Sequence, residues 1–430
     1  MRVVIINKSD STGGAAIVSR RLLEALLQQG VDARMLVAEK LTDSPRIELA
    51  APAFIIKEKF IAERLRIYCE NGFNRSTLFK IDTAGEGLPL WRHPRVLEAD
   101  VIMLNWVNQG MLSIKGIEKI CNLGKPVIWT MHDMWNMTGI CHHAGICSRY
   151  QSLCSNCPLL GKKGKPKDLS TRIFGRKQQL YNSSGRSGQE PGKRPVTFVA
   201  VSHWLAEKAA GSVLLKNQEV RVIPNALPIN ATLPDIKERN IIDRIKILFG
   251  AARLDDPIKG LPKVIAMTRE LKENYPEVAA RVELHTFGGI KEPLLLDQMA
   301  VKTVNHGMLH GEESLRSLYA DADMIISASD YETLPTTLME AQLYGAITIA
   351  FDSGGQKDII DSGKNGLLLE PPDNIEDAGR LLARSVNDII AIIDSPGRRE
   401  YLQNMRQSVL SKFSPEKVAG QYIALMKELL

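Results

Sequence analysis

One stretch of this chain, residues 324–366, limits the fold more than any other. It reads MIISASDYETLPTTLMEAQLYGAITIAFDSGGQKDIIDSGKNG. A short apolar strand (324–327) leads through a polar loop to a helix that starts at about Thr336, and a second apolar strand (347–351) follows. Strand, loop, helix and strand in this order form a parallel βαβ unit, in which ligands bind outside the carboxyl ends of the strands. We therefore expect an α/β fold with a binding site in this loop.

The loop and the helix carry polar groups that suit a sugar nucleotide. Glu332 lies in the loop and Glu340 lies in the helix. The first backbone amides of the helix, those of Thr336, Thr337 and Leu338, lie at the positive end of the helix dipole, which favours phosphate. One carboxylate can then bind sugar hydroxyls while the other binds ribose hydroxyls.

The order of these residues points to a family. Glu332 and Glu340 form an E-x7-E pair, which is followed by Gly345, Gly354–Gly355 and Asn365–Gly366. This order resembles the donor-binding half of the retaining glycosyltransferases of family 4, which have the GT-B fold. The resemblance implies two doubly wound, Rossmann-like α/β domains that face each other across a cleft. It also implies that a sugar is transferred from a nucleotide diphosphate sugar (UDP or GDP) to a saccharide or lipid-linked saccharide acceptor.

The length of the chain indicates two domains, because 430 residues exceed what one hydrophobic core usually serves. We expect an N-terminal, acceptor-side domain over residues 1–229 and a C-terminal, nucleotide-sugar-binding domain over 240–412. A terminal helix over 413–430 is expected to return to the first domain. No apolar run reaches the length of about eighteen residues that a membrane-spanning helix needs. The start of the chain, MRVVIINKSD, has too short an apolar core for a signal peptide, so we expect a cytoplasmic protein.

Two sites in the first half also match the family. Gly13 and Gly14 follow the first predicted strand and resemble the loop that approaches the donor phosphates and the acceptor. The alternative is that these glycines only permit a tight turn. His132 directly follows a predicted strand (127–131) and resembles the family's histidine, which faces the transferred sugar. The alternative is a histidine with a structural role.

Arg253 and Lys259 follow the first strand of the second domain, predicted at 245–250. They resemble the family's Arg and Lys pair, which holds the donor diphosphate. Two fixed cations can neutralise the charge that develops on the departing diphosphate without a divalent metal, so no cofactor is expected for catalysis. A solvated surface pair is the alternative. The resemblance also implies that the leaving phosphate helps to deprotonate the acceptor, so no protein nucleophile is expected.

Four cysteines lie close together in residues 141–157, with the spacing C-x5-C-x6-C-x2-C. They are Cys141, Cys147, Cys154 and Cys157. In a reducing compartment such a cluster indicates a structural zinc site, and four thiolates would leave no open position for substrate. Free thiols or two disulfides are the alternatives. The His-Asp pair followed by these cysteines is similar to family 4 enzymes of exopolysaccharide assembly, including those of colanic-acid type.

Residues 159–195 form a basic segment, with ten Lys and Arg residues against Asp168 and Glu190. This local excess is larger than the net charge of +6 of the whole chain. A basic segment that also carries apolar residues suits an anionic membrane surface or a pyrophosphate-bearing lipid, so we expect peripheral contact with the inner face of the membrane. A solvated, mobile loop is the alternative.

Two other classes of protein fit parts of the sequence. A GT-B nucleotide-sugar epimerase or hydrolase is one alternative, but the Arg253 and Lys259 pair, the E-x7-E pair and the basic segment together favour transfer to an acceptor. A zinc-knuckle nucleic-acid-binding protein would use the cysteines and the basic segment. Few aromatic residues lie among those lysines, however, and the donor motifs would have no role, so we expect no nucleic-acid partner.

Overall fold

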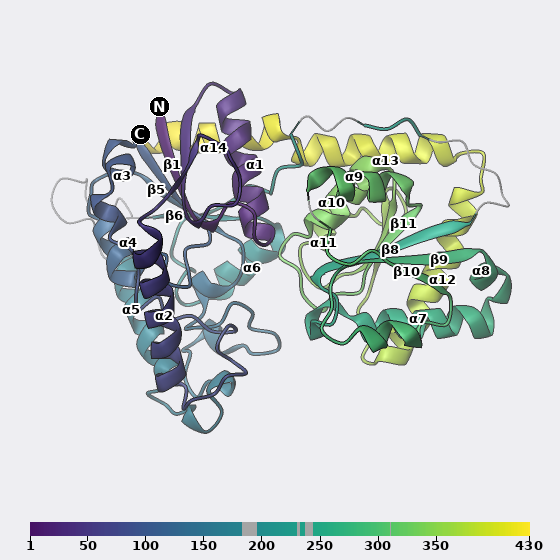
Figure 1. Ribbon diagram of the computed structural model, residues 1–430, viewed down its shortest axis with the longest axis horizontal. Coiled ribbons are helices and arrows are strands. Elements are labelled where there is room, and N and C mark those ends of the chain that lie inside the picture. Colours follow the sequence, from purple (N-terminus) through teal and green to yellow (C-terminus); the bar gives the residue numbers. More distant parts are fainter. Residues whose placement is uncertain (183–195, 230–232, 237–243, 310) are drawn as a thin grey trace. The chain divides into compact units, whose positions relative to one another are not determined.

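The computed structural model describes residues 1–182, 196–229, 233–236, 244–309 and 311–430. The chain divides into two compact units, Met1–Ile229 with Pro415–Leu430, and Asn230–Ser414. Each unit is built on one parallel sheet with helices on its faces (Figure 1). The predicted α/β class with two Rossmann-like domains is therefore confirmed. None of the helices in the described residues is long and apolar enough to cross a membrane.

The sheet of the first unit has the strand order β3-β2-β1-β4-β5-β6-β7. Its strands are β1 (Arg2–Ser9), β2 (Asp32–Glu39), β3 (Ile47–Leu49), β4 (Val101–Leu104), β5 (Val127–Met131), β6 (Thr197–Ala200) and β7 (Val220–Val222). The central strands are almost wholly apolar because helices cover both faces of a parallel sheet. The strand order reverses between β1 and β4, and this is the point where doubly wound sheets bind ligands.

The helices of the first unit include one from the end of the chain. They are α1 (Gly14–Gln28), α2 (Ala53–Glu70), α3 (Pro94–Glu98), α4 (Ile114–Cys121), α5 (Leu169–Asn182), α6 (His203–Gly211) and α14 (Pro415–Leu429). Short 3-10 turns are η1 (Leu90–Arg92), η2 (Trp135–Met137), η3 (Arg149–Gln151) and η4 (Pro158–Lys163). Helix α14 packs against α1, and its Tyr422 hydroxyl lies 3.0 Å from the Thr130 hydroxyl on β5. The last helix thus completes the core of the first unit.

The sheet of the second unit has the strand order β10-β9-β8-β11-β12-β13. Its strands are β8 (Ile245–Arg253), β9 (Val282–Gly289), β10 (Lys302–Asn305), β11 (Met324–Ser327), β12 (Ile347–Phe351) and β13 (Gly366–Leu369). Its helices are α7 (Leu261–Asn274), α8 (Pro276–Arg281), α9 (Glu312–Asp321), α10 (Thr336–Tyr344), α11 (Gln356–Ile359), α12 (Ile375–Ile393) and α13 (Arg398–Phe413), with 3-10 turns η5 (Pro257–Lys259) and η6 (Pro293–Gln298). Its order reverses between β8 and β11, which therefore mark the ligand edge of this sheet.

Two details differ from the sequence-based expectations. The strand expected to end at Gly250 continues to Arg253, because the chain resumes pairing with β9 after a register shift. The basic segment is also not uniformly solvated. Within α5, Lys177 is fully buried. The part of the segment that follows α5, residues 183–195, lies outside the described residues.

Candidate functional site

The loops that follow β8 and β11 are tied together at the carboxyl edge of the second sheet. The backbone amide of Asp330 donates to the Ile258 carbonyl over 2.8 Å. The ammonium group of Lys263 donates to the Ala328 carbonyl over 3.2 Å and also pairs with the Asp330 carboxylate. Because these bonds join the two loops, the predicted donor-site residues that they carry are presented together at the point where the strand order reverses.

Lys259 and Glu332 are in direct contact at this edge. The Lys259 Nζ lies 2.7 Å from Glu332 Oε1, and the Ser329 hydroxyl donates to the same oxygen over 2.9 Å. The second carboxylate oxygen, Oε2, accepts no hydrogen bond from the described residues. Both side chains are partly exposed, with 29% of Lys259 and 18% of Glu332 accessible. The pair therefore offers a cation and a free carboxylate oxygen to one ligand.

The two glycines after β12 have a steric role at this site. The backbone of Glu332 pairs with Gly354, and the Gly355 amide donates to the Glu332 carbonyl over 2.9 Å. A Cβ atom at Gly354 would come within 1.9 Å of the Glu332 carbonyl oxygen, and one at Gly355 within 2.0 Å of the Thr333 oxygen. The glycines therefore let a second loop pack against the backbone that carries Glu332.

Arg253 lies at the end of β8, and it pairs with two acids of its own loop. Its Nε lies 3.4 Å from Asp255 Oδ1, and its Nη2 lies 3.3 Å from Asp256 Oδ2. Within the described residues, no hydrogen bond or ion pair joins Arg253 to Lys259 or Glu332. The Arg253 side chain is 41% accessible, so an anion can approach it.

The start of α10 provides two free amide donors. Pro335 precedes the helix and supplies no side-chain cap. The amides of Thr336 and Thr337 donate no hydrogen bond within the described part of the chain, whereas the Leu338 amide donates to the Pro335 carbonyl over 3.1 Å. Two of the three predicted donors are thus available to an anion, and the third is already used. Glu340 lies one turn further along α10 and is only 6% exposed.

The predicted residues of the first unit lie at the carboxyl edge of its own sheet. Gly13 is the residue before α1 and has a φ of 88°, a conformation that favours glycine. Gly14 is the first residue of that helix. His132 directly follows β5, and burial lowers its pKa to about 4. The imidazole is therefore neutral at pH 7 and can donate one hydrogen bond and accept another.

The four cysteines are all free thiols, and Cys154 and Cys157 are buried. The Gly139 amide donates to Cys154 Sγ over 3.2 Å. Burial raises the pKa of Cys141 to about 12 and that of Cys154 to about 11, so both are protonated unless a cation binds. In the described ranges no group of three or more His, Cys, Asp or Glu side chains is placed to hold a metal ion. The zinc site therefore stays a prediction.

Lys177 is buried beside the cysteines, although its charge alone placed it in the basic segment. The Lys177 ammonium donates to the carbonyls of Trp135 (2.5 Å) and Thr138 (3.1 Å), and burial lowers its pKa to about 7. The sequence contains a signal for this position. Ile173 and Tyr181 are both buried and lie one helical turn before and after Lys177, which places the lysine on the apolar face of α5.

The comparisons with known proteins agree with this geometry. Residues 234–407 match the family model "Glycosyl transferases group 1". Over its full length the chain is 23% identical to the "Putative colanic acid biosynthesis glycosyl transferase WcaC" of Escherichia coli (strain K12), with all of both chains covered. Residues 234–407 thus form a group 1 glycosyltransferase domain, and the protein is a glycosyltransferase.

Solved structures of similar fold extend over the whole of this glycosyltransferase. Anabaena HepE, solved in complex with UDP and glucose, aligns with a TM-score of 0.59 at 15% identity, covering 100% of both chains. WaaG, a glycosyltransferase involved in lipopolysaccharide biosynthesis, aligns with a TM-score of 0.58 at 12% identity, covering 99% of both chains. At these identities the likeness concerns the fold, and it confirms the expected GT-B fold.

Proposed function

We propose that this glycosyltransferase moves a sugar from a nucleotide diphosphate sugar to a saccharide or lipid-linked saccharide during synthesis of a cell-surface polysaccharide. The name of the full-length Escherichia coli relative supports the polysaccharide pathway. A UDP donor is supported by the Anabaena structure, which holds UDP-glucose. A GDP donor is supported by a GDP-mannose-dependent alpha-mannosyltransferase of Corynebacterium glutamicum, 36% identical over 92 residues that cover 21% of this chain and 22% of that protein.

The observation that carries this proposal is the contact of Lys259 with Glu332 on loops that are tied together at the ligand edge of the second sheet. Lys259 and Arg253 would neutralise the charge that develops on the departing diphosphate, and the Thr336 and Thr337 amides would bind its oxygens. The free oxygen of Glu332 would accept a hydrogen bond from a sugar hydroxyl. Glu340 would bind the ribose in the same way.

We infer that the reaction retains the configuration at the anomeric carbon, as in family 4. The leaving phosphate would take the proton of the acceptor hydroxyl as the new glycosidic bond forms, so no side chain has to act as nucleophile. His132 would orient the sugar or the acceptor through neutral hydrogen bonds, because its lowered pKa keeps it uncharged at pH 7. No step of this scheme requires a metal ion.

Binding of the donor can be tested by thermal unfolding with a panel of UDP-, GDP- and ADP-sugars, since a ligand that binds only the native state raises the melting temperature. We expect one base to stabilise the protein and Lys259→Ala to abolish the effect. If no nucleotide sugar shifts the transition, the proposed donor site is wrong.

The reaction type requires a second experiment. Incubation of a labelled donor with and without a membrane saccharide extract separates transfer, in which label enters a glycan, from hydrolysis or epimerisation, in which it does not. The anomeric coupling constant of the product, measured by NMR, tests retention. An inverted product would contradict the mechanism while leaving the donor site intact.

A further inference from the structure

A polar loop in the first unit has no role in the donor chemistry described above. Residues 105–110, with the sequence NWVNQG, follow β4 at the point where the strand order of the first sheet reverses. Backbone bonds tie this loop to β1. The Lys8 amide donates to the Trp106 carbonyl over 2.9 Å, and the Trp106 amide donates to Asn7 Oδ1 over 2.8 Å. The loop is therefore fixed at the ligand edge of this sheet.

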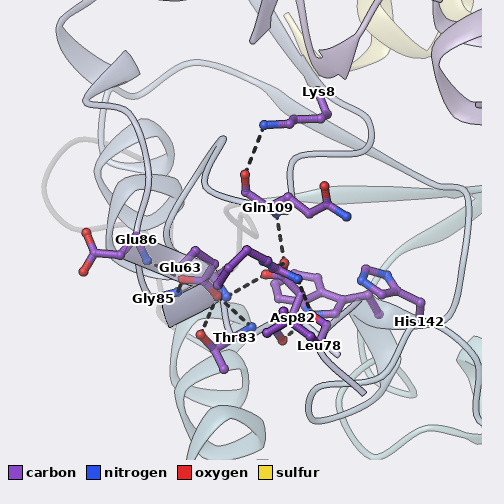
Figure 2. Close-up of polar contacts among 12 residues, drawn as sticks. Lys8, Glu63, Leu78, Asp82, Thr83, Gly85, Glu86, Gln109 and His142 are labelled. Atoms are coloured by element: carbon purple, nitrogen blue, oxygen red, sulfur yellow. Dashed lines mark hydrogen bonds and ion pairs between the residues drawn. The ribbon is translucent and has the colours of Figure 1, made fainter. Parts of the chain in front are cut away.

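Gln109 is held in an unfavourable backbone conformation by two charged groups. Its φ is 55°, in a region that residues other than glycine rarely occupy. Its amide donates to Asp82 Oδ2 over 2.9 Å, and its carbonyl accepts a bond from Lys8 Nζ over 3.1 Å (Figure 2). Strained residues held in this way are concentrated at binding and catalytic sites.

Figure 2 shows that the side-chain carboxamide of Gln109 points away from both charged groups. It makes no hydrogen bond within the described residues, and it is partly exposed. Both of its polar atoms can therefore bind a ligand. The two bonds to the Gln109 backbone set the direction of this side chain. The strained backbone conformation therefore determines where the carboxamide meets a ligand.

Buried charged side chains support the backbone contacts of Gln109. Asp82 is fully buried and pairs with Arg64, and the Glu63 carboxylate accepts bonds from the amides of Thr83, Gly85 and Glu86 over 2.9–3.0 Å (Figure 2). Burying such charges costs free energy of desolvation, and apolar residues would stabilise a core at least as well. These buried charges are better explained by the position that they give to Gln109.

A hydrogen bond at the edge of the indole ring fixes the orientation of Trp106. Its Nε1 donates to Asp133 Oδ2 over 2.8 Å, and the same oxygen lies 2.7 Å from Nδ1 of His142. The Trp135 amide donates to the other Asp133 oxygen over 2.8 Å, so the carboxylate itself is fixed. Trp106 is partly exposed while the only polar atom of its indole is already bonded. The His142 ring lies against the indole, with 5.5 Å between the ring centroids, and the rest of the indole is a rigid aromatic surface.

The same loop contains a buried donor that has no partner among the described residues. Asn108 is only 4% exposed, and its Nδ2 donates no hydrogen bond to any of them. A buried donor left unsatisfied costs free energy, and native proteins seldom retain one unless a ligand or water completes it. The aromatic face, the free carboxamide and the buried donor all belong to one six-residue loop.

We propose that residues 105–110 form the subsite for a pyranose ring of the saccharide acceptor. The Trp106 face would pack against the C–H face of the sugar, whose hydrogens are attracted to the negative potential of the ring. Gln109 and Asn108 would bind ring hydroxyls. Lys8, Asp82 and Asp133 are positioning residues, since they act through the loop. This inference rests on the proposed sugar transfer, and it assigns the loop to the acceptor because the groups proposed to hold the diphosphate, on Arg253, Lys259, Thr336 and Thr337, all lie in the second unit.

The test uses the full chain labelled with 5-fluorotryptophan, with the Trp106 resonance in the ¹⁹F NMR spectrum assigned by Trp106→Phe. The probes are methyl glycosides of glucose, galactose, mannose, fucose and glucuronic acid at millimolar concentration. We expect at least one of them to shift the Trp106 resonance saturably. If none does, or if only the other four tryptophans respond, the subsite is wrong.

Gln109→Gly provides the decisive variant, because glycine accepts the positive φ without strain and removes the side chain that carries the carboxamide. We expect this variant to be at least as stable as the wild type and to bind the same glycoside about three- to tenfold more weakly, which is the effect of one or two lost hydrogen bonds. Gln403→Ala, an exposed change on α13, is the matched control and should bind normally. Unchanged binding in Gln109→Gly would overturn the proposal.

The donor experiment separates this inference from the function on which it rests. Gln109→Gly should keep the thermal shift that a nucleotide sugar gives in the wild type. If the wild type shows no donor shift, the proposed function fails, whatever the glycosides do. If the donor shift is present and the Trp106 resonance does not respond, only the acceptor subsite fails.

Discussion

Lys259 and Glu332 neutralise each other in the absence of a donor, which gives the site a specific electrostatic property. A half-buried cation without a counter-charge is costly, and Glu332 removes that cost. In the proposed donor complex, Lys259 would turn toward the diphosphate while Glu332 exchanges its ammonium partner for a sugar hydroxyl. The two residues should therefore act as a unit.

Replacement of either residue should reduce transfer without unfolding the protein. We expect Lys259→Ala and Glu332→Ala each to lower kcat/KM by roughly a hundredfold or more, because each removes an oriented group at the developing charge. Lys272→Ala, an exposed change on α7, should have no effect. The double variant should lose much less than the product of the two single losses. Near wild-type activity in either single variant would place the site elsewhere.

His132 should make stability depend on pH in a defined window. Its pKa is about 4 in the folded protein against 6.5 for a free histidine, so between these values only the unfolded chain takes up the proton. Stability is thus present above pH 6.5 and is lost as the pH falls toward 4, by up to about 3 kcal/mol for a shift of this size. His132→Asn should flatten the decline in unfolding free energy over this range. The exposed His203→Asn should not, and an equal slope in both variants would contradict the assignment.

At the scale of the elements, the βαβ pattern predicted most of the architecture. The strands expected at 127–131, 324–327 and 347–351 are β5, β11 and β12 at the same residues, and α10 begins at Thr336 as expected. Strand β3 was missed because three residues, one of them a glutamate, carry too little apolar periodicity. The buried position of Lys177 was missed because counting charges over a segment ignores which face of the helix each residue occupies.

The candidate site could be predicted from the sequence to about the same extent as the fold. Glu332 and Lys259 could be named from their resemblance to the family's motifs, and their places after strands predicted that both lie at one edge of the sheet. The ion pair between them could not be named, because it depends on the path of two loops. Trp106 and Gln109 gave no sequence signal, since their roles depend on a backbone angle and on partners far away in the sequence.

Two glycines with opposite environments test the packing of the donor loops. At Gly354 a methyl group would collide with the Glu332 carbonyl, so Gly354→Ala should destabilise the second unit by roughly 2–4 kcal/mol. At Gly420, within α14, a methyl group meets nothing within 4 Å, so Gly420→Ala should stabilise by about 0.5–1 kcal/mol through the helix preference of alanine. Thermal unfolding of both variants checks the signs. A harmless Gly354→Ala would mean that the loops are not packed as described.

The cysteine cluster makes a prediction about metal content. If the predicted structural zinc site forms, protein purified without chelator should contain about one zinc per chain by atomic emission, and Cys154→Ser with Cys157→Ser should remove it. Cys69→Ser, a change at an exposed cysteine on α2, is the control and should retain the metal. Native, folded protein free of zinc would rule the site out.

At the scale of the whole molecule, the surface charge predicts where the enzyme works. Lys162, Lys163, Lys165 and Lys167 are all exposed beside η4. Replacing these four lysines by glutamine should weaken binding to phosphatidylglycerol vesicles at low salt by about tenfold or more, given roughly 1 kcal/mol for each lysine near an anionic surface. Glutamines at Lys115, Lys216, Lys272 and Lys427, which are also exposed, remove the same charge elsewhere. If both variants lose vesicle binding equally, the effect comes from the net charge and not from the position of the four lysines.

Helix α14 has a consequence for the order in which the protein forms on the ribosome. The first unit consists of residues at both ends of the chain, and the second unit is inserted between them. Met426 and Tyr422, which help to fill the core of the first unit, are synthesised after the whole of the second unit. The second unit can therefore fold while translation continues, whereas the first must wait, partly open, until α14 has left the ribosome.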